Sequence, residues 1–471
     1  MTIRVVVLLT ILMIDAHMVG MNIRLSLLTY LTSINQYLWG PPMLAGIALI
    51  GAYLMYGLRF MPLKKIGYAA GLLLRSRHAD RRGKGDITPF NALMTALSGA
   101  VGSGNIVGVA TAIYLGGPGA LFYMWLVALI GMAISFTEAT SAVNYRQQDS
   151  HRHSIGGPMY YIHAGMAKST PVIGRFLSAV YAFLASISVL SIGNMVQINS
   201  IAAILSDDFG FQPILIGLVV MILVGAVILG GIKRIADFAG KLVPVMIIVY
   251  LFSGLMILAY HFDRLFPTLQ LIVKEAFSLE SAKGGAVGTG MVAAIRYGVA
   301  RGIFSNEAGL GTTAIAHAAA KTNDPVRQGY IAMLSTFIDT IVVCSITGLV
   351  ILVTQSHRSG ETGAVLTGHA FSQVLPSGSI VVTVALAVFA FTTMVGYSYY
   401  GEKCIQYLVG DWVLVPYRLL WLLVIPLGAV FKLELVWSIC ETMMALMMIP
   451  NLIGLWFLGP EVFRMCRNYR H

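Results

Sequence analysis

The sequence predicts an all-α polytopic membrane protein with about eleven transmembrane helices, and three observations lead to this class. The chain has 471 residues, of which 57% are hydrophobic and only 11% are charged, whereas soluble proteins carry roughly 25% charged residues. Apolar segments of about 20 residues recur along the chain, and each is long enough to cross a bilayer. The segments do not alternate in polarity, which favours helices, and open strand edges cannot face lipid.

Eleven apolar segments mark the expected helices, and no polar stretch between them is long enough for a soluble domain. The segments are Trp39–Leu58, Phe90–Leu115, Leu121–Val143, Phe176–Leu205, Ile214–Gly231, Leu242–Tyr260, Gly285–Gly302, Tyr330–Val353, Ile380–Gly401, Val413–Val430 and Val436–Leu458. Cysteine spacing indicates neither a disulfide framework nor a cysteine metal site. The four cysteines are Cys344, Cys404, Cys440 and Cys466.

Lysine and arginine residues predict the orientation of the chain. The connection after the first segment is the most basic, with Arg59, Lys64, Lys65, Arg75, Arg77, Arg81, Arg82 and Lys84. Basic connections face the cytoplasm, so we expect the N-terminus outside and residues 459–471 inside, as a cytoplasmic tail. Topology then accounts for the net charge of +11, and no nucleic-acid partner is indicated. We expect a multi-pass protein of the cell (inner) membrane, surrounded by lipid, with no obligate protein partner.

The first twenty residues contain an apolar stretch, "VVVLLTILMI", that is too short to span a bilayer. No small-residue cleavage site of a signal peptide follows it. Met21 offers a second start, so residues 1–20 are either part of an N-terminal lead, residues 1–38, or an overextended reading frame. The sequence leaves both alternatives open.

The stretch "SGAVGSGNIVG", Ser98–Gly108, places glycines inside an apolar segment, although each glycine destabilises a helix interior by about 1 kcal/mol relative to alanine. A dinucleotide-binding loop is excluded, because that fingerprint needs a preceding strand and a closer third glycine. Close helix packing through Gly104 and Gly108 is one explanation. The other is a discontinuous helix, whose free amide and carbonyl groups bind substrate and cation in secondary transporters.

A second glycine-rich stretch favours the discontinuous helix. "AVGSG" at Ala100–Gly104 returns as "AVGTG" at Ala286–Gly290, each in a segment that begins a set of five. Corresponding interrupted helices in two halves predict a five-plus-five inverted repeat, with an alternative second break at Gly298–Gly302. The expected organisation is an extra helix at 39–58, a first repeat at 88–260 and a second repeat at 284–458.

Longer motifs give the chain a family resemblance. "GSGNIVGVATAIYLGGPGALFYMWLVALIGM" (Gly102–Met132) and "GVARGIFSNEAGLGTTAIAHAAAKTNDPVRQG" (Gly298–Gly329) closely resemble the alanine or glycine:cation symporter family, as do "GNMVQINSIA" (Gly193–Ala202), "FIDTIVVC" (Phe337–Cys344) and "SYYGEKC" (Ser398–Cys404). The resemblance implies the fold of the leucine-transporter superfamily. It also implies sodium-coupled symport of small neutral amino acids, alanine and glycine, into the cell. Tyr123 and Tyr397 are departures, because family members usually have tryptophan there.

The chemistry of an amino acid zwitterion suggests where it binds, since a buried charge without a partner is costly. The backbone N–H groups of the broken helix at Gly102, Ser103 and Gly104 are the expected carboxylate site. Gln197 either faces the ammonium group or ties helices together, as do Asn194 and Asn199 beside it. The resemblance adds Thr393 and Tyr397 to the substrate pocket.

Sodium is a hard cation that needs oxygen ligands, and the resemblance implies five of them. They are the carbonyl groups of Ala100 and Val101, the amide oxygen of Asn105, and the hydroxyl groups of Thr392 and Thr393. The alternative roles are an interhelical hydrogen bond for Asn105 and hydrogen bonds to their own helix for the threonines. No cofactor and no metal other than sodium is indicated.

Four charged residues within or near the segments are expected to have partners, because charges are costly in lipid. Glu138 is either structural or part of ion coupling. Asp339 is expected to pair with Arg296 or Arg301, and Glu307 to form an inner gate with Arg301. We assign Glu138, Arg301, Glu307 and Asp339 to gating or coupling.

Other functional classes are less favoured. The sequence has no nucleophile–base pair and no H-E-x-x-H motif, so we expect no enzyme. An ion channel would need repeated filter elements, and none occurs. A proton-coupled carrier, or one for another amino acid, is the main alternative, and the preference among alanine, glycine and serine stays open.

Overall fold

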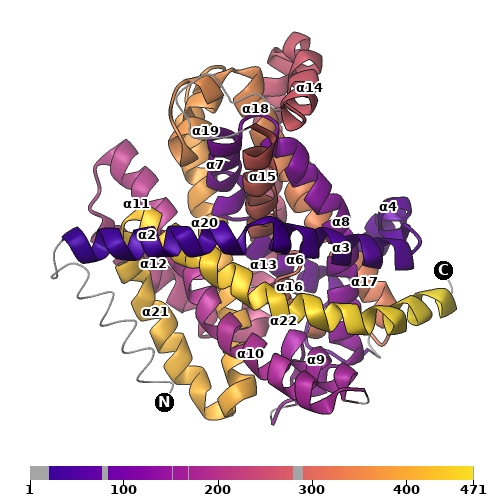
Figure 1. Ribbon diagram of the computed structural model, residues 1–471. Helices are drawn as coiled ribbons and strands as arrows, with labels where there is room; N and C mark the ends of the chain where they lie inside the picture. Colours follow the sequence, from indigo (N-terminus) through magenta and orange to yellow (C-terminus); the bar gives the residue numbers. More distant parts are fainter. Residues whose placement is uncertain (1–20, 77–82, 151, 168, 279–289, 470–471) are drawn as a thin grey trace.

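The computed structural model describes residues 21–76, 83–150, 152–167, 169–278 and 290–469, and these residues are almost entirely helical (Figure 1). The first part of the chain forms α2 (Met21–Leu38), α3 (Pro41–Gly57), α4 (Met61–Lys64), α5 (Ile66–Arg75), α6 (Pro89–Ala100), η1 (Ser103–Asn105), α7 (Val107–Gly116), α8 (Ala120–Asn144), β1 (Gln147–Gln148), β2 (Ser154–Ile155), α9 (Pro158–Met166), α10 (Pro171–Leu190), η2 (Ser191–Met195), α11 (Val196–Phe209), α12 (Pro213–Ile228), α13 (Gly231–Tyr260) and α14 (Phe262–Ala276). β1 and β2 form a short antiparallel hairpin.

The second part forms α15 (Gly290–Asn306), α16 (Thr312–Ala318), α17 (Pro325–Thr336), η3 (Phe337–Cys344), α18 (Ser345–Val353), η4 (Ser356–Arg358), α19 (Gly363–Ser372), α20 (Gly378–Val409), η5 (Asp411–Val413), α21 (Leu414–Val430) and α22 (Leu433–Asn468). The all-α class is confirmed. Most of the predicted tail, residues 459–468, continues α22 as helix.

The helices that could cross a membrane agree with the eleven predicted segments. Within the described residues, seven continuous helices are long and apolar enough to cross a membrane, and counting two bent pairs raises the number to nine. The prediction of eleven also counts α12, with 16 residues, and α15, with 17 residues. Each predicted segment therefore corresponds to a helix or a bent helix pair.

Local sequence signals explain where key helices begin. The Thr88 hydroxyl accepts a hydrogen bond from the Asn91 N–H at 3.0 Å, and Pro89 opens α6. Asp324 accepts from two backbone N–H groups at the start of α17, which again opens with a proline. Both patterns satisfy backbone donors that a helix start leaves free.

The predicted discontinuous helix in the first half is confirmed. α6 ends at Ala100, and its axis meets the helix that begins at Ser103 at an angle of 60°. In Figure 1, α6 lies in the middle of the molecule and α7 above it. We call the link at residues 101–106 the first break.

Within the described residues, the second half is interrupted after both predicted positions. Residues 286–289 of the "AVGTG" stretch lie outside the described residues. The alternative at Gly298–Gly302 is wrong, because α15 is continuous there and both glycines serve close packing: a Cβ on Gly298 would overlap the Ala120 carbonyl, and one on Gly302 would crowd Val127.

The interruption in the second half separates α15 from α16 at residues 307–311. Glu307, Gly309 and Gly311 have φ angles of 59°, 90° and 74°. Glycine adopts this left-handed conformation without a Cβ clash, so the two glycines explain why the helix stops. We call residues 307–311 the second break.

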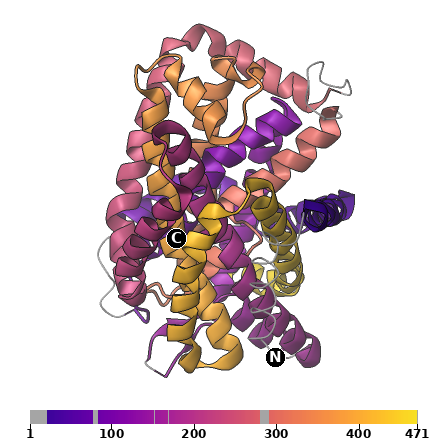
Figure 2. The ribbon, with the colours of Figure 1, turned by 90° about the vertical axis from the view of Figure 1, so that its left-hand side faces the viewer.

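The two interrupted helices pair antiparallel. α7 packs against α15 and α6 packs against α16, so in Figure 1 one chain segment rises through α6 and α7 while the other descends through α15 and α16. This is the arrangement that an inverted repeat predicts. Figure 2, turned by 90°, shows helices of both halves along a common long axis, with α2 (indigo) projecting to one side.

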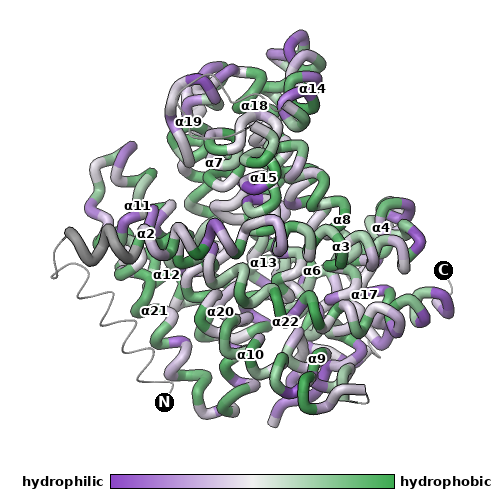
Figure 3. Tube along the Cα trace, in the orientation of Figure 1, coloured by the Kyte–Doolittle hydropathy of each residue, from purple (hydrophilic) through white to green (hydrophobic). Residues whose placement is uncertain are grey.

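Apolar residues also cover the outer surface. The most apolar 18 residues of α13 have a mean hydropathy of 2.5, yet only 39% of them are buried. In the corresponding stretch of α21 only 28% of the residues are buried. Figure 3 shows such apolar residues (green) along the length of these helices, while hydrophilic residues gather near α9, at α14 and at the end of α22. Exposed apolar surface of this extent indicates contact with lipid.

Candidate functional site

The first break places bare backbone against α20. Val101 leaves the helix with φ −77° and ψ 91°, and a single turn, η1, follows. A Cβ on Gly102 would overlap the Thr393 hydroxyl. Glycine is therefore required for this close approach between the break and α20.

Oxygen atoms from α6 and α20 converge at the first break. The Thr393 hydroxyl lies 3.1 Å from the Gly99 carbonyl oxygen and 3.4 Å from the Val101 carbonyl oxygen. Both threonines also bond to their own helix at the Phe389 carbonyl, Thr392 at 2.8 Å and Thr393 at 3.1 Å, but Thr392 faces Met246 of α13. The structure thus brings Val101 and Thr393 together, next to the end of α6 at Ala100, and leaves Thr392 apart.

Asn105 connects the first break to the π-helical segment η3. Its Oδ1 accepts a hydrogen bond from the Gly102 N–H at 2.9 Å, and its Nδ2 donates to the Asp339 carboxylate at 2.7 Å. That carboxylate also accepts from Ser305 at 2.8 Å and Thr340 at 2.7 Å. The Asn105 oxygen keeps a second lone pair, so its role as a cation ligand stays a prediction.

Gln197 reaches the predicted carboxylate site from α11. Its Oε1 accepts from the Ser103 N–H at 3.0 Å, and its Nε2 donates to the Ile192 carbonyl at 3.0 Å. The Ser103 hydroxyl is buried without a hydrogen-bond partner among the described residues. Gly104 packs on α15, where an added Cβ would lie 3.0 Å from the Phe304 ring.

The other two amides of this polar cluster tie helices together. Asn194 donates to the Trp421 carbonyl at 2.8 Å, and Asn199 donates to the carbonyls of Gly428 and Phe431 at 3.0 and 2.6 Å. Both acceptor sets belong to α21 and its end. Of the three amides, Gln197 alone contacts the first break.

Tyr397 fills the space between α20 and the π-helical segment η2. It is 1% exposed, and its ring lies so close to Gly193 that a Cβ there would overlap it. Its ring also packs against Tyr400 at a centroid distance of 5.3 Å. Because Thr393 lies one turn earlier on α20, both side chains share a face.

Side chains of α22 and α10 bind the carbonyl groups of the second break. Asn451 of α22 donates to Glu138 at 2.7 Å and to the Gly309 carbonyl at 2.9 Å, and it accepts from Tyr161 at 2.5 Å. Tyr181 of α10 donates to the Leu310 carbonyl at 2.8 Å.

The predicted ion pairs of Arg301 are wrong. Arg301 binds Glu441 of α22, with 2.6 Å between Nη2 and Oε1, and its guanidinium lies 4.2 Å from the centroid of Trp437. Arg296 lies over its neighbour Tyr297. Asp339 has hydroxyl and amide partners, and Glu307 has Thr312. Arg301 therefore belongs to a contact between α15 and α22, where the Trp437 ring also packs on Phe304 at 4.7 Å.

Sequence reasoning missed several residues at this centre. Ser305 and Phe304 lie within the "FSNEAGLG" motif that carries the resemblance, so their place near the first break could have been inferred from it. Asn451, Trp437 and Glu441 belong to no motif, and their positions depend on how α22 crosses the broken helices.

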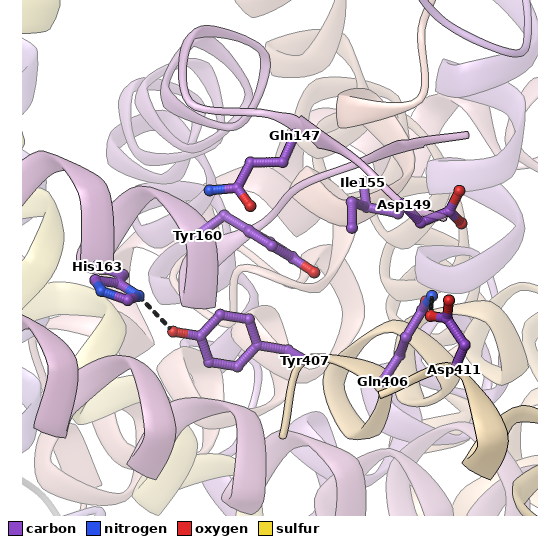
Figure 4. A pocket seen from close by; sticks show the side chains of 8 residues that line it. All are labelled: Gln147, Asp149, Ile155, Tyr160, His163, Gln406, Tyr407 and Asp411. Atoms are coloured by element: carbon purple, nitrogen blue, oxygen red, sulfur yellow. Dashed lines mark hydrogen bonds between the residues drawn. The ribbon is translucent and has the colours of Figure 1, made fainter. Parts of the chain in front are cut away.

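A separate pocket lies near the hairpin, at the end of α20 (Figure 4). It has a volume of about 430 Å³ and is lined by Gln147, Asp149, Ile155, Tyr160, His163, Gln406, Tyr407 and Asp411. Within it, the Tyr407 hydroxyl and His163 Nδ1 are 2.8 Å apart. None of the residues predicted for substrate or sodium lines this pocket, so it is distinct from the site at the first break.

Two interrupted helices that pair antiparallel around a buried polar centre define a secondary transporter of the leucine-transporter fold. Solved structures agree at the level of the fold. The chain is similar to the manganese transporter of Eremococcus coleocola, with a TM-score of 0.51 and 14% identity over 75% of this chain and 74% of that chain.

The sequence model of the sodium:alanine symporter family matches residues 25–471, and the chain belongs to this family. Among its relatives are the sodium/alanine symporter AgcS of Methanococcus maripaludis, 44% identical over 91% of this chain and 94% of the relative, and the probable sodium/glutamine symporter GlnT of Bacillus subtilis, 36% identical over 92% of this chain and 89% of the relative. The predicted family and the amino acid symporter class are confirmed. The prediction that the protein is not an enzyme is confirmed as well, because the family consists of transporters.

Proposed function

We propose that this protein carries alanine and glycine into the cell together with sodium by alternating access. The observation that carries the proposal is the first break, where carbonyl groups of α6 meet the Thr393 hydroxyl beside Gly102. Sodium requires several oxygen ligands, and Ala100, Val101, Asn105 and the threonines of α20 supply the candidate set, with Val101 and Thr393 already in contact.

The amino acid is proposed to lie next to this cation. Its carboxylate takes the N–H groups at Gly102, Ser103 and Gly104, where the two glycines have no side chain. The Gly102 N–H is bound to Asn105 at 2.9 Å and has to be released for this. Gln197, which now accepts from the Ser103 N–H at 3.0 Å, releases that donor to the carboxylate and turns toward the ammonium group.

Side-chain size favours the smallest substrates. Tyr397 is fully enclosed and packs directly on Gly193, so little room remains beyond a methyl group. The name of the AgcS relative, a sodium/alanine symporter, supports alanine. The name of the GlnT relative, a probable sodium/glutamine symporter, makes glutamine the second candidate.

The orientation proposed for this activity follows the basic residues, with the N-terminus outside and the C-terminus in the cytoplasm of a cell membrane. α7 and α15 then lie on the outer side of the breaks, and α6 and α16 on the cytoplasmic side. A reporter that works only in the cytoplasm should be active when fused at Arg467 and inactive when fused near Arg358.

Uptake into proteoliposomes tests the proposal. The full-length protein should accumulate radiolabelled alanine when a sodium gradient is applied, and potassium or choline should not replace sodium. Glycine should compete strongly with alanine, whereas glutamine and leucine should not. Uptake that is unchanged without sodium would contradict the coupling, and strong competition by glutamine would favour the second candidate.

A further inference from the structure

Two carboxyl groups flank the second break without a basic partner. Glu138 and Glu307 are fully buried, and across the described residues no ion pair joins either one to lysine, arginine or histidine. Each retains one oxygen without a hydrogen-bond partner, Oε2 of Glu138 and Oε1 of Glu307. Two buried, unpaired negative charges near one break would be strongly unfavourable.

The surroundings of the two carboxyl groups differ. Glu138 receives the Asn451 amide at 2.7 Å and faces the backbone N–H groups of Gly309 and Gly311. These donors suit an ionised carboxylate. Glu138 is therefore the carboxyl group that the protein stabilises as an anion.

Glu307 is surrounded by hydroxyl groups. Its Oε2 accepts from the Thr312 hydroxyl, and its carboxyl group also meets the Tyr397 hydroxyl. Its Oε1 is directed toward α6, where a Cβ on Gly99 would lie 3.0 Å from it and 3.1 Å from the Tyr400 hydroxyl. A hydroxyl group can accept from a neutral carboxyl group as well as donate to an ionised one, so these partners do not require a negative charge. When two carboxyl groups lie in different environments, one can stay ionised at a pH where the other is protonated. One group is then charged and the other neutral.

We propose that Glu307 binds a proton in this closed arrangement of the helices, while Glu138 remains ionised. The inference rests on the proposed symport and adds a proton site to it, separate from the cation site at the first break. When alternating access opens α16 toward water, Glu307 becomes hydrated and releases the proton. In alternating access the loaded carrier passes through a closed state, so sodium and alanine should favour the protonated form.

A proton fits this place better than a second metal cation. A metal ion would need several oxygen ligands directed at one point, whereas the carbonyls of Gly309 and Leu310 are directed at Asn451 and Tyr181 and keep only one lone pair each. The free oxygen of Glu307 faces α6, whereas Glu138 is bound to α22. A proton needs only a single lone pair.

The neighbouring elements contribute no positive charge to Glu307. The basic groups on the helices that surround it are engaged elsewhere: Arg301 with Glu441, His317 with Gln328, and Lys403 with Gln406. The titratable groups that face the two glutamates are Tyr161, Tyr181, Tyr397, Tyr400 and Asp339. All of them are neutral or negative, so they also favour a protonated Glu307.

The proton site is tested by measuring the affinity of the purified full-length protein for alanine, in saturating sodium, at pH values from about 5.5 to 8.5. Because the closed state holds the proton, wild-type affinity should weaken as pH rises, by up to about tenfold per pH unit above the titration midpoint. Glu307→Gln should flatten this dependence, whereas Glu434→Gln, at the exposed start of α22, should behave as wild type. Thr312→Val removes the donor to the ionised form and should move the midpoint to higher pH.

Proton uptake provides a readout that does not depend on variants. Adding sodium and alanine together to wild-type protein in weak buffer should remove up to about one proton per protein from solution. Parallel pH profiles for wild type and Glu307→Gln, or no proton uptake by wild type, would overturn the inference. Sodium-dependent alanine binding that is insensitive to pH would leave the proposed symport intact, whereas absence of that binding would refute the symport itself.

Discussion

The two breaks interrupt equivalent helices, yet they are built in opposite ways. At the first break two amide side chains accept from backbone N–H groups, Asn105 from Gly102 and Gln197 from Ser103, and the Ser103 hydroxyl has no partner among the described residues. At the second break the carbonyl groups of Gly309 and Leu310 are bound by Asn451 and Tyr181 from the surrounding helices. The first break is therefore suited to binding ligands, whereas the second break is a structural connection that neighbouring helices hold in place.

The backbone groups that an interrupted helix leaves unpaired can either bind a ligand or be bound by side chains of the protein, and the two breaks illustrate these two outcomes. Free amide and carbonyl groups are costly when buried, and at the first break Asn105 and Gln197 occupy N–H groups that we propose are exchanged for cargo. At the second break it uses side chains, at the expense of placing two carboxyl groups there. Substitutions at the two places should therefore have different effects, on transport at the first break and on stability at the second.

Gly102→Val should have the largest effect. A β-branched side chain would overlap Thr393 and cover the backbone, so sodium-driven alanine uptake should fall by more than about 100-fold, while the amount of protein in the membrane stays normal. Gly108→Ala is the matched control, because its Cβ would meet only the Phe304 ring at 3.9 Å. Normal uptake by the valine variant would show that the first break holds no ligand.

Asn451→Ala should act on the second break. The change leaves the Gly309 carbonyl and the Tyr161 hydroxyl without their partner and should destabilise the folded protein by about 2–4 kcal/mol. A lower melting temperature in detergent, with unchanged half-saturating sodium in the protein that remains folded, is the expected result. Asn144→Ala, at an exposed asparagine, should not change the melting temperature. A change in sodium dependence alone would contradict the division between the breaks.

Thr393→Ala should weaken sodium binding without affecting stability. Loss of one oxygen ligand should raise the half-saturating sodium concentration about tenfold, equivalent to about 1.4 kcal/mol. Thr392→Ala is the informative comparison, because Thr392 shares the Phe389 carbonyl of its own helix with Thr393 but faces α13. Equal effects of the two changes would show that the structure does not distinguish the threonines functionally.

Tyr397→Ala should have the smallest effect on alanine itself. Removing the ring that packs on Gly193 should admit larger side chains, for which one methylene is worth about 1–3 kcal/mol. Competition by valine and leucine should therefore become measurable while sodium dependence is kept. The exposed Tyr56→Ala serves as control, and unchanged selectivity would exclude Tyr397 from the substrate pocket.

Sequence patterns predicted the first break better than the second because its signal is local. Three closely spaced glycines and a family motif mark residues 101–106, and contact between Val101 and Thr393 agrees with the expectation. For the second break, the stretch at Ala286–Gly290 lies largely outside the described residues, and the glycines of the alternative position, Gly298 and Gly302, allow α15 to approach α8. Glycine spacing alone does not separate close packing from a left-handed turn.

Long-range partners could not be inferred from the sequence for a physical reason. Arg301 and Asp339 each required a partner, and the nearest charged residues along the motifs were the natural candidates. The structure instead supplies Glu441 to Arg301 and hydroxyl and amide groups to Asp339. These contacts depend on the crossing of α22 and η3 over the broken helices, which periodicity does not encode.

The π-helical segments η2 and η3 also constrain how this chain can change length. A π turn accommodates an additional residue within a helix, so one residue can be removed from η2 or η3 if the turn closes to α geometry, and the flanking helices then keep their relative orientation. Removing one residue from the regular helix on either side would instead rotate everything beyond it by about 100° and would turn Gln197 away from Ser103. Single-residue deletions in Ser191–Met195 or Phe337–Cys344 should thus be less damaging than deletions in the regular turns of α10 or α17, and sequence comparisons across these helices need their gaps placed within the π turns.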